Sequence, residues 1–327
     1  MQPGAPLRIL MTGYSGFVGG YLRERCLAAF PEARLFGLSE HDEESSPAHG
    51  AASLEVFAAD MTDAGAVRRA VAEARPDLIF HLAALSSVAA SWQAPERTLA
   101  VNAGGTIHLL EAVRHADLEP RVLLIGSGEQ YGLVRPEDNP ISEDYLPRPA
   151  NPYAVSKVAQ DLYGYQYFAA FGLPIVRVRA FNHIGPRQAS TFVVASFASQ
   201  IARIEAGLAP PLLLVGNLDA RRDFLAVEDV TRAYVALARD GHAGEAYNVG
   251  SGQGRAIGEV LDMLLGMSRV HVDVERDPKR MRPADVPVLV ADTTKLQAHT
   301  SWRPEIPLEE ALRQTLAYWR RAYSPAS

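Results

Sequence analysis

Short apolar runs alternate with stretches of helical periodicity along the first 130 residues. The apolar runs, each of which reads as a buried strand, cover residues 7–12, 35–38, 54–57, 77–82 and 121–125. Helical periodicity follows a glycine-rich turn up to about residue 30, and returns over 63–74 and about 95–114. This alternation predicts an α/β fold with a doubly wound parallel sheet, whose ligand crevice lies at the carboxyl ends of the strands.

The second half is less regular. A helix is expected over about 191–206, a strand over 212–215 and a closing helix over 308–323, while residues 136–149, with four prolines, read as an irregular connector. No repeat or low-complexity linker divides the chain. We therefore expect two interleaved lobes: a dinucleotide-binding domain of residues 1–181 plus about 222–249, and a smaller C-terminal substrate lobe of residues 182–221 plus 250–327.

Composition narrows the function classes. The 327 residues are 48% hydrophobic and 21% charged, as in an ordinary globular protein, and a net charge of −6 gives no reason to expect binding to nucleic acid or to an anionic membrane. No apolar run approaches the roughly 18 residues that span a bilayer, and the N-terminus lacks the blocks of a signal peptide. A single cysteine, Cys26, and the absence of metal-ligand spacing predict a cytoplasmic protein without a disulfide or a metal.

A glycine-rich turn between the first strand and the first helix is the first candidate site. Gly13, Gly16 and Gly19 allow a tight turn and close approach of a pyrophosphate to the backbone. At the second strand, Gly37 stands where an acid usually takes a ribose 2′-OH. Ser39 could donate to a 2′-phosphate, whereas Glu40 would repel one, and no arginine is close in sequence. The sequence is therefore compatible with either NADP(H) or NAD(H) as the cofactor.

A second candidate site lies where a helix is expected to begin. Asn151 can cap the helix, and Pro152 suits its first position. Tyr153 and Lys157 then lie one turn apart on one face, so a phenol has an ammonium beside it. Taken alone, the pair also fits an ordinary amphipathic helix. The chain has only two other lysines, Lys279 and Lys295, which favours a specific need for an ammonium at position 157.

Five motifs in order resemble the extended short-chain dehydrogenase/reductase family, and the resemblance covers essentially the whole chain. They are the glycine turn, Asp60-Met61, His81-Leu82-Ala83-Ala84, Ser127-x-x-x-Tyr131-Gly132 and Tyr153-x-x-x-Lys157. Residues 179–186, 215–224 and 280–286 resemble the nucleotide-sugar branch that handles GDP-mannose derivatives. The resemblance implies a Rossmann-like sheet, an NAD(P)-dependent enzyme, a GDP-sugar substrate and a homodimer formed through a four-helix contact.

The resemblance also implies a reaction. We expect reduction of the C4 ketone of GDP-4-keto-6-deoxy-D-mannose to GDP-D-rhamnose, with GDP-mannose 4,6-dehydration as the alternative and nucleotide-sugar epimerisation as a weaker one. Residues 182–186 read Asn-His-Ile-Gly-Pro, which departs from the dehydratase pattern and favours the reductase. A cofactor-binding sensor built on a retired enzyme fold would not need Ser127, Tyr153 and Lys157 together.

Roles follow from the same resemblance. Tyr153 would protonate the C4 oxygen, Lys157 would lower the pKa of that phenol and bind the nicotinamide ribose, and Ser127 would polarise the carbonyl. Glu129 either acts as an acid/base at C5 and C6, as in dehydratases, or only shapes the strand end.

Binding residues are implied for both ligands. For the cofactor they are Gly13, Ser15, Gly16, Phe17, Val18, Gly19, Ser39, Asp60, Met61, Leu82, Ala83, Ala84, Tyr153 and Lys157. For the substrate they are Ser87, Asn182, Val193, Arg222 and Arg282, with the two arginines clamping the diphosphate. Asp60 could instead be a helix cap, and each arginine, taken alone, a surface ion-pair partner.

Overall fold

The computed structural model describes residues 6–40, 54–281 and 286–324. Its large sheet runs in the order β10-β6-β5-β4-β1-β2-β3, and all neighbouring strands are parallel. The strands are β1 (Arg8–Thr12), β2 (Arg34–Ser39), β3 (Leu54–Ala58), β4 (Leu78–His81), β5 (Arg121–Ser127), β6 (Ile175–Ala180) and β10 (Ala246–Val249). The strand order reverses between β1 and β4, which is where a doubly wound sheet opens its ligand crevice.

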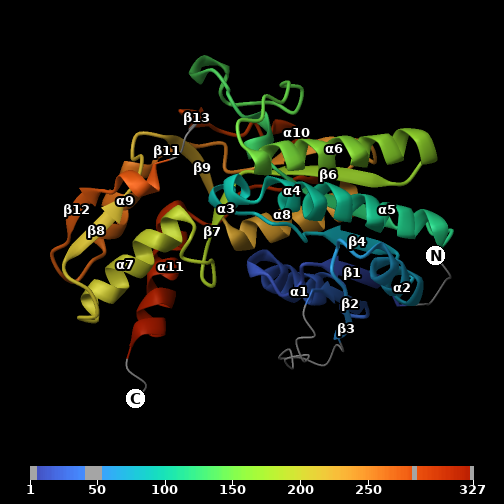
Figure 1. Cartoon of the computed structure of the whole chain (residues 1–327), viewed down its shortest axis with the longest axis horizontal. Coiled ribbons are helices and arrows are strands. Elements are labelled where there is room, and N and C mark those ends of the chain that lie inside the picture. Colours follow the sequence, from blue (N-terminus) through green and yellow to red (C-terminus); the bar gives the residue numbers. More distant parts are fainter. Residues whose placement is uncertain (1–5, 41–53, 282–285, 325–327) are drawn as a thin grey trace.

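Helices cover both faces of this sheet (Figure 1). One buried apolar cluster joins the strands to α1 (Phe17–Ala29), α8 (Val227–Asp240) and α10 (Thr294–Thr300). A second cluster joins them to α2 (Ala64–Ala74), α5 (Gly105–His115) and α6 (Pro152–Phe171). The predicted α/β class, with a doubly wound parallel sheet, is confirmed.

The helix expected over 95–114 is interrupted. The chain forms α3 (Val88–Gln93), which was not predicted, then α4 (Pro95–Leu99), a π-helical turn over Ala100–Gly104, and α5. Within the π turn, the Asn102 side chain accepts from the N–H of Leu85 at 2.8 Å and donates to its carbonyl at 3.1 Å. This contact between residues 17 apart in the chain leaves no trace in the apolar periodicity, so the sequence predicted one regular helix.

The smaller lobe has its own sheets and core (Figure 1). β9 (Arg221–Ala226) pairs with β7 (Asn182–Ile184), β11 (Gly254–Ala256) and β13 (Val288–Leu289), and β8 (Leu212–Val215) pairs with β12 (Asp273–Arg276). α7 (Val193–Glu205), α9 (Ile257–Gly266) and α11 (Leu308–Tyr323) bury a shared cluster that includes Phe197, Leu261 and Leu312. The predicted helix over 308–323 and strand over 212–215 are present.

The chain passes between the lobes more than once. After β7, α7, β8 and β9 it returns to the large sheet with α8 and β10. Residues 222–226 were assigned to the cofactor domain, but they lie in β9, within the smaller lobe's sheet. We therefore propose a boundary near residue 227 rather than 222. The connector 136–149 holds a 3₁₀ turn (Pro136–Asp138) and two isolated bridges, Gly132 to Arg148 and Ile141 to Ala291.

Candidate active site

The glycine turn is compact enough to need its glycines. Gly13 has φ +67°, and a Cβ there would lie 2.9 Å from the Ala83 nitrogen. A Cβ on Gly19 would collide with the Tyr14 carbonyl oxygen. The remaining residues of the turn are open, since Ser15 and Gly16 are exposed and Phe17 and Val18 are half-buried at the start of α1. This close-packed turn at a helix N-terminus fits a dinucleotide pyrophosphate.

At the end of β2, the structure shows a role for Gly37 and a charged neighbour that the sequence did not indicate. A Cβ on Gly37 would lie 2.6 Å from the Tyr14 ring, so Gly37 makes room for that ring, and the strand continues to Ser39. Glu40 follows, and Arg97 of α4 lies 3.7 Å from it. An arginine is therefore near this strand end in space although none is close in sequence, because α4 approaches from 57 positions along the chain.

Asp60 and Met61 follow β3. The carboxylate of Asp60 accepts from the N–H of Thr62 at 2.8 Å, while the cap of α2 is Asp63, which accepts from Gly65 and Ala66. Asp60 thus stabilises a turn rather than a helix start. Met61 is buried against Gly105 of α5. Both residues lie at the carboxyl edge of the sheet, and their contact with adenine stays a prediction.

A buried polar network supports the turn after β4. His81 is hydrogen-bonded through Nδ1 to Thr12 Oγ1 at 2.7 Å and through Nε2 to Thr106 Oγ1 at 2.9 Å. Thr12 Oγ1 also accepts from the N–H of Ala83 at 3.0 Å. Burial lowers the pKa of His81 to about 3, and nearby Lys157 acts in the same direction, so the ring is neutral. Thr12 thus holds the backbone N–H groups of Leu82 and Ala83, through its carbonyl and its hydroxyl, beside the glycine turn.

The predicted catalytic residues converge where β5 ends and α6 begins. Asn151 caps α6 by accepting from the N–H of Ala154 at 2.8 Å, as predicted from the sequence. The N–H of Tyr153 donates to Ser91 Oγ of α3 at 3.2 Å, a contact that the sequence did not indicate. Ser127 is the last residue of β5, and its side chain hydrogen-bonds to that of Tyr153.

Lys157 is buried, and the hydrogen-bond partners of its ammonium are groups other than Tyr153. Its ammonium donates to the Ile125 carbonyl at 2.9 Å and to Gln160 Oε1 at 2.8 Å, and it lies 6.0 Å from the centre of the Tyr153 ring. Burial lowers the pKa of Lys157 to about 7. Burial raises the pKa of Tyr153 to about 12, because the hydrogen bond with Ser127 offsets it only in part and Glu129 adds to the rise. Burial thus outweighs the other influences on this phenol, and the lowering of its pKa by Lys157 stays a prediction.

Two further side chains complete this corner of the site. Asn102 donates to Ser156 Oγ at 2.9 Å, and Ser156 donates to the Tyr153 carbonyl at 2.7 Å. The network of the π turn thus reaches the first turn of α6. An asparagine inside an otherwise helical apolar pattern was the signal that could have revealed it.

Glu129 lies beside the same helix start. It belongs to a 3₁₀ turn over Gly128–Tyr131, is half-buried, and accepts from Asn151 Nδ2 at 3.2 Å. One amide side chain therefore holds both the helix N-terminus and this carboxylate. The geometry leaves Glu129 near Tyr153, where a carboxylate could act on a substrate or only shape the turn.

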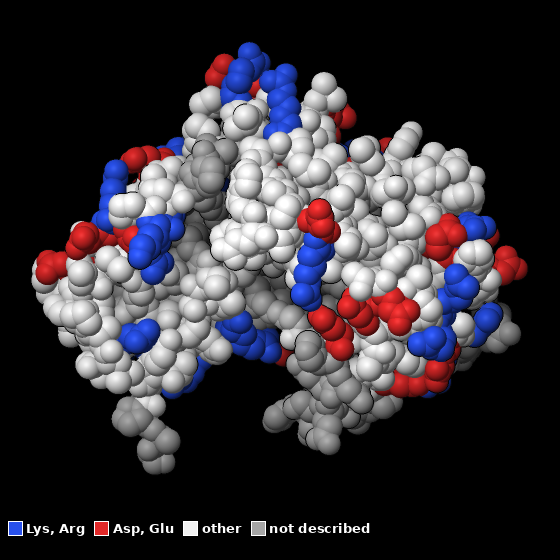
Figure 2. All heavy atoms as spheres, viewed as in Figure 1, with Lys and Arg blue, Asp and Glu red and all other residues white. Residues whose placement is uncertain are grey.

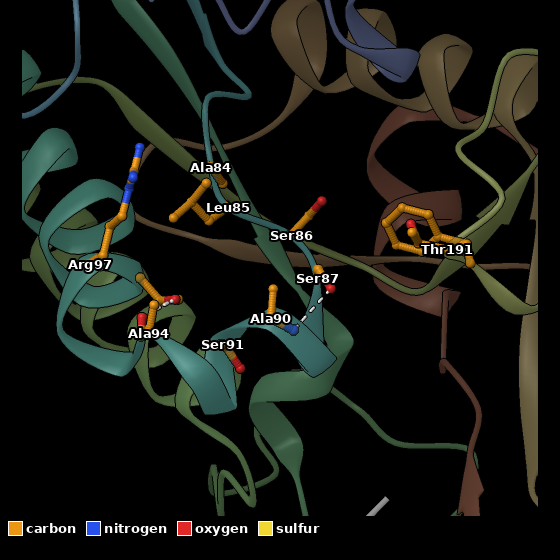
Figure 3. A pocket seen from close by; sticks show the side chains of 11 residues that line it. Ala84, Leu85, Ser86, Ser87, Ala90, Ser91, Ala94, Arg97 and Thr191 are labelled. Carbon is orange, nitrogen blue, oxygen red and sulfur yellow. Dashed lines mark hydrogen bonds between the residues drawn. The ribbon is translucent and has the colours of Figure 1, made fainter. Parts of the chain in front are cut away.

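A cavity of about 430 Å³ opens beside this corner (Figure 3). Its walls are the segment Ala84–Ser87, one side of α3 and α4, and residues Thr191 and Phe192 from the smaller lobe. Ser87 lines it and caps α3 by accepting from the N–H of Ala90 at 3.2 Å. Val193 begins α7, directly after Phe192. The structure thus brings together Ala84 and Ser87 with the chain next to Val193.

The remaining substrate candidates are more dispersed. Asn182 is half-buried in β7. Arg222 is buried in β9, where its guanidinium donates to the Val286 carbonyl at 2.6 Å and to the Arg221 carbonyl at 3.0 Å. Arg282 lies outside the described residues. The diphosphate roles of both arginines stay predictions.

The parallel sheet, the glycine turn and the Ser127, Tyr153 and Lys157 corner define an NAD(P)-dependent enzyme of the extended short-chain dehydrogenase/reductase class. A family model described as GDP-mannose 4,6 dehydratase matches residues 10–315. The chain belongs to this family.

Individual relatives are similar over nearly their full length. GDP-6-deoxy-D-mannose reductase of Pseudomonas aeruginosa is 37% identical over 312 residues, which is 95% of this chain and 97% of the relative. The structure of RMD from Pseudomonas aeruginosa complexed with NADPH has a TM-score of 0.83 at 36% identity, over 96% of this chain and 99% of that one. The UDP-glucose 4-epimerase of Thermus thermophilus in complex with NAD has a TM-score of 0.85 at 32% identity, over 97% of this chain and 100% of that one.

The described residues offer neither a metal cluster nor a membrane span. Among them, no group of three or more His, Cys, Asp or Glu side chains could hold a metal ion. No helix in that part of the chain has the length and apolar character needed to cross a membrane.

Proposed function

We propose that this chain reduces the C4 ketone of GDP-4-keto-6-deoxy-D-mannose to GDP-D-rhamnose at the expense of NADPH or NADH. The observation that carries the proposal is the 37% identity with the Pseudomonas reductase over 97% of its length. The clustering of Ser127, Tyr153 and Lys157 at one strand end supports it. NADPH and NAD in the similar structures support both cofactors.

When bound, the reduced nicotinamide supplies a hydride to C4 of the sugar. Tyr153 supplies the proton to the C4 oxygen, and its raised pKa keeps the phenol protonated at neutral pH. Ser127 donates a hydrogen bond to the same oxygen and so stabilises the negative charge that develops there. The ketone gains one hydride and one proton, and the phenolate left on Tyr153 takes a proton back from water. Lys157, half-protonated near pH 7, lies close enough to stabilise that phenolate.

A spectrophotometric assay tests the proposal. Purified protein with GDP-4-keto-6-deoxy-D-mannose and NADPH or NADH should consume one reduced cofactor per ketone. The loss of the absorbance of reduced nicotinamide measures this consumption. Consumption with the 4-keto sugar of another nucleotide, but not with the GDP sugar, would reject the GDP assignment.

One observation favours a second function, the 4,6-dehydration of GDP-mannose. Glu129 is held 3.2 Å from Asn151 and acts electrostatically on Tyr153, so a carboxylate is available beside the reacting sugar. Dehydration regenerates its cofactor, so GDP-mannose with a catalytic amount of NADP⁺ would give a 4-keto product without net consumption. Glu129→Gln separates the roles: it should abolish dehydration while leaving ketone reduction within about tenfold of the original rate.

We also propose that the chain forms a homodimer through α6 and α4. Large apolar side chains are exposed there, and Figure 2 shows few charged side chains over this surface. They are Leu99 of α4 and Val155, Leu162 and Tyr163 of α6, with Trp92 of the preceding helix α3. An exposed apolar patch of this kind marks an interaction surface. Light scattering should give a dimer mass for the natural chain and a monomer mass for Leu162→Lys, while a dimeric variant would reject this interface.

The GDP moiety and the cellular setting complete the proposal. We assign Arg222 and Arg282 to the diphosphate of the nucleotide sugar, and Asn182 to the diphosphate or the sugar. Ser87 and Val193 are further substrate-binding residues of the proposal. The sole cysteine, Cys26, is buried and free, which suits the reducing cytoplasm.

A further inference from the structure

Glu40 and Arg97 come from distant parts of the chain and meet beside the end of β2. Glu40 directly follows Ser39, the last residue of that strand, and Arg97 lies in α4. The guanidinium Nη2 is 3.7 Å from the carboxylate Oε1, and the side chains of Arg97 and Glu40 are 66% and 55% exposed. An exposed pair at this distance adds little to stability, so a ligand can displace either partner.

The pair lies at the cofactor end of the crevice. The N–H of Gly13 donates to the Leu38 carbonyl at 3.1 Å, so the glycine turn is tied to the end of β2. Arg97 also lines the cavity next to Ala84 and Leu85, and Figure 3 shows it rising from α4 on the side away from Thr191. Arg97 therefore connects the wall of the crevice with the strand end that meets the adenosine ribose in dinucleotide folds.

The two charges have opposite preferences for the group at the ribose 2′ position. A carboxylate accepts a hydrogen bond from a 2′-OH and repels a 2′-phosphate. A guanidinium binds phosphate oxygens with two parallel hydrogen bonds, which are stronger than its contact with an exposed carboxylate at 3.7 Å.

We propose that Glu40 and Arg97 together set the choice between NAD(H) and NADP(H). Glu40, with Arg97 as its counter-ion, accepts from the 2′-OH of NAD(H), whereas Arg97 leaves Glu40 to bind the 2′-phosphate of NADP(H). Ser39, at the same strand end, adds a hydroxyl donor to that phosphate. The inference rests on the proposed function only in that a nicotinamide dinucleotide binds at the glycine turn.

Titration calorimetry of NADPH and NADH with the protein, in the absence of substrate, tests the role of Glu40 and Arg97 in cofactor choice. Arg97→Gln should weaken the binding of NADPH by about tenfold or more and change the affinity for NADH by less than about twofold. The reason is that only the 2′-phosphate of NADPH forms a strong charge-assisted contact with Arg97. Glu40→Gln should tighten the binding of NADPH, because the repulsion between the carboxylate and the 2′-phosphate is lost. It should weaken the binding of NADH, because the carboxylate that accepts from the 2′-OH is lost. Arg34→Gln is the matched control, because Arg34 forms an exposed pair with Glu55 at the opposite end of β2.

The ratio of the two dissociation constants decides the outcome. Opposite shifts of this ratio in Arg97→Gln and Glu40→Gln, with no shift in Arg34→Gln, support the inference. A ratio within about twofold of the natural chain in both variants, or shifts in the same direction, overturns it while leaving the proposed function intact. Failure of the natural chain to bind either cofactor overturns both.

Discussion

The two ends of the cofactor crevice use polar residues in contrasting ways. At the ends of β4 and β5 the polar side chains are buried and joined in networks: His81 is fully buried and Lys157 is 3% exposed, with two hydrogen bonds from its ammonium. At the end of β2, Glu40 and Arg97 are more than half exposed and make one long ion pair. Buried groups have fixed positions and shifted pKa values, as proton transfer requires, while exposed charges can exchange partners when a ligand arrives.

The largest effect is expected at the buried end, from Tyr153→Phe. This variant keeps the ring but removes the proton donor, so the rate of ketone reduction should fall by about 10²–10⁴-fold. Cofactor dissociation constants should change by less than about threefold, because the ring and Lys157 remain. Steady-state kinetics with calorimetry checks both values, and a variant with near-natural turnover would show that another group donates the proton.

Asn102→Ala should break the support beneath that corner. The variant leaves the N–H and carbonyl of Leu85 without their side-chain partners and removes the donor to Ser156. Loss of buried hydrogen bonds of this kind should lower the free energy of unfolding by about 2–3 kcal/mol, measured in urea. Thr98→Ala is the control, because its hydroxyl bonds only locally, to the Ala94 carbonyl. Equal losses in both variants would contradict a special role for the π turn.

Lys157→Met tests the lowered pKa by its effect on stability. In the folded natural chain Lys157 binds its proton only below about pH 7, whereas the unfolded chain binds it below about 10.5, so the natural chain gains stability as pH rises through that window. The methionine variant lacks this gain. The free energy of unfolding of the variant minus that of the natural chain should therefore be more positive at pH 6 than at pH 9, by about 2–3 kcal/mol. Urea unfolding of both proteins at both pH values measures it. A difference that does not depend on pH would mean that the lysine titrates normally.

Glu40→Gln should have the smallest effect on stability. Because both members of the Glu40–Arg97 pair are exposed, its loss should change the free energy of unfolding by less than about 0.5 kcal/mol. A loss above about 1.5 kcal/mol would show that the strand end is a structural contact, and the contrast between the two ends of the crevice would then be wrong.

Sequence patterns predicted what depends on neighbours in the chain. The alternation of strands and helices, the cap by Asn151 with Pro152 after it, and the closing helix over 308–323 are all present, because each follows from periodicity or from local hydrogen bonds. Contacts across the fold were missed. The Glu40–Arg97 pair joins residues 57 apart, and Asn102 reaches Leu85 through a π turn that periodicity does not show.

The electrostatics of the site could not be derived from spacing either. Tyr153 and Lys157 lie on one face of α6, as expected from their spacing of four. Burial, which depends on the whole fold, raises the pKa of the phenol and lowers that of the lysine. In the same way, spacing gave no sign that the guanidinium of Arg222 is buried and donates to the Val286 carbonyl, and its role as a diphosphate clamp stays a prediction.

One labelled turnover tests the central claim most directly. The protein is incubated with GDP-4-keto-6-deoxy-D-mannose and NADPH or NADH deuterated at nicotinamide C4 on the transferred face, and the sugar product is examined by NMR. We predict GDP-D-rhamnose with deuterium at C4 of the sugar and one oxidised cofactor per product. Unchanged ketone with no cofactor oxidised, together with conversion of GDP-mannose to its 4-keto-6-deoxy derivative, would contradict the account.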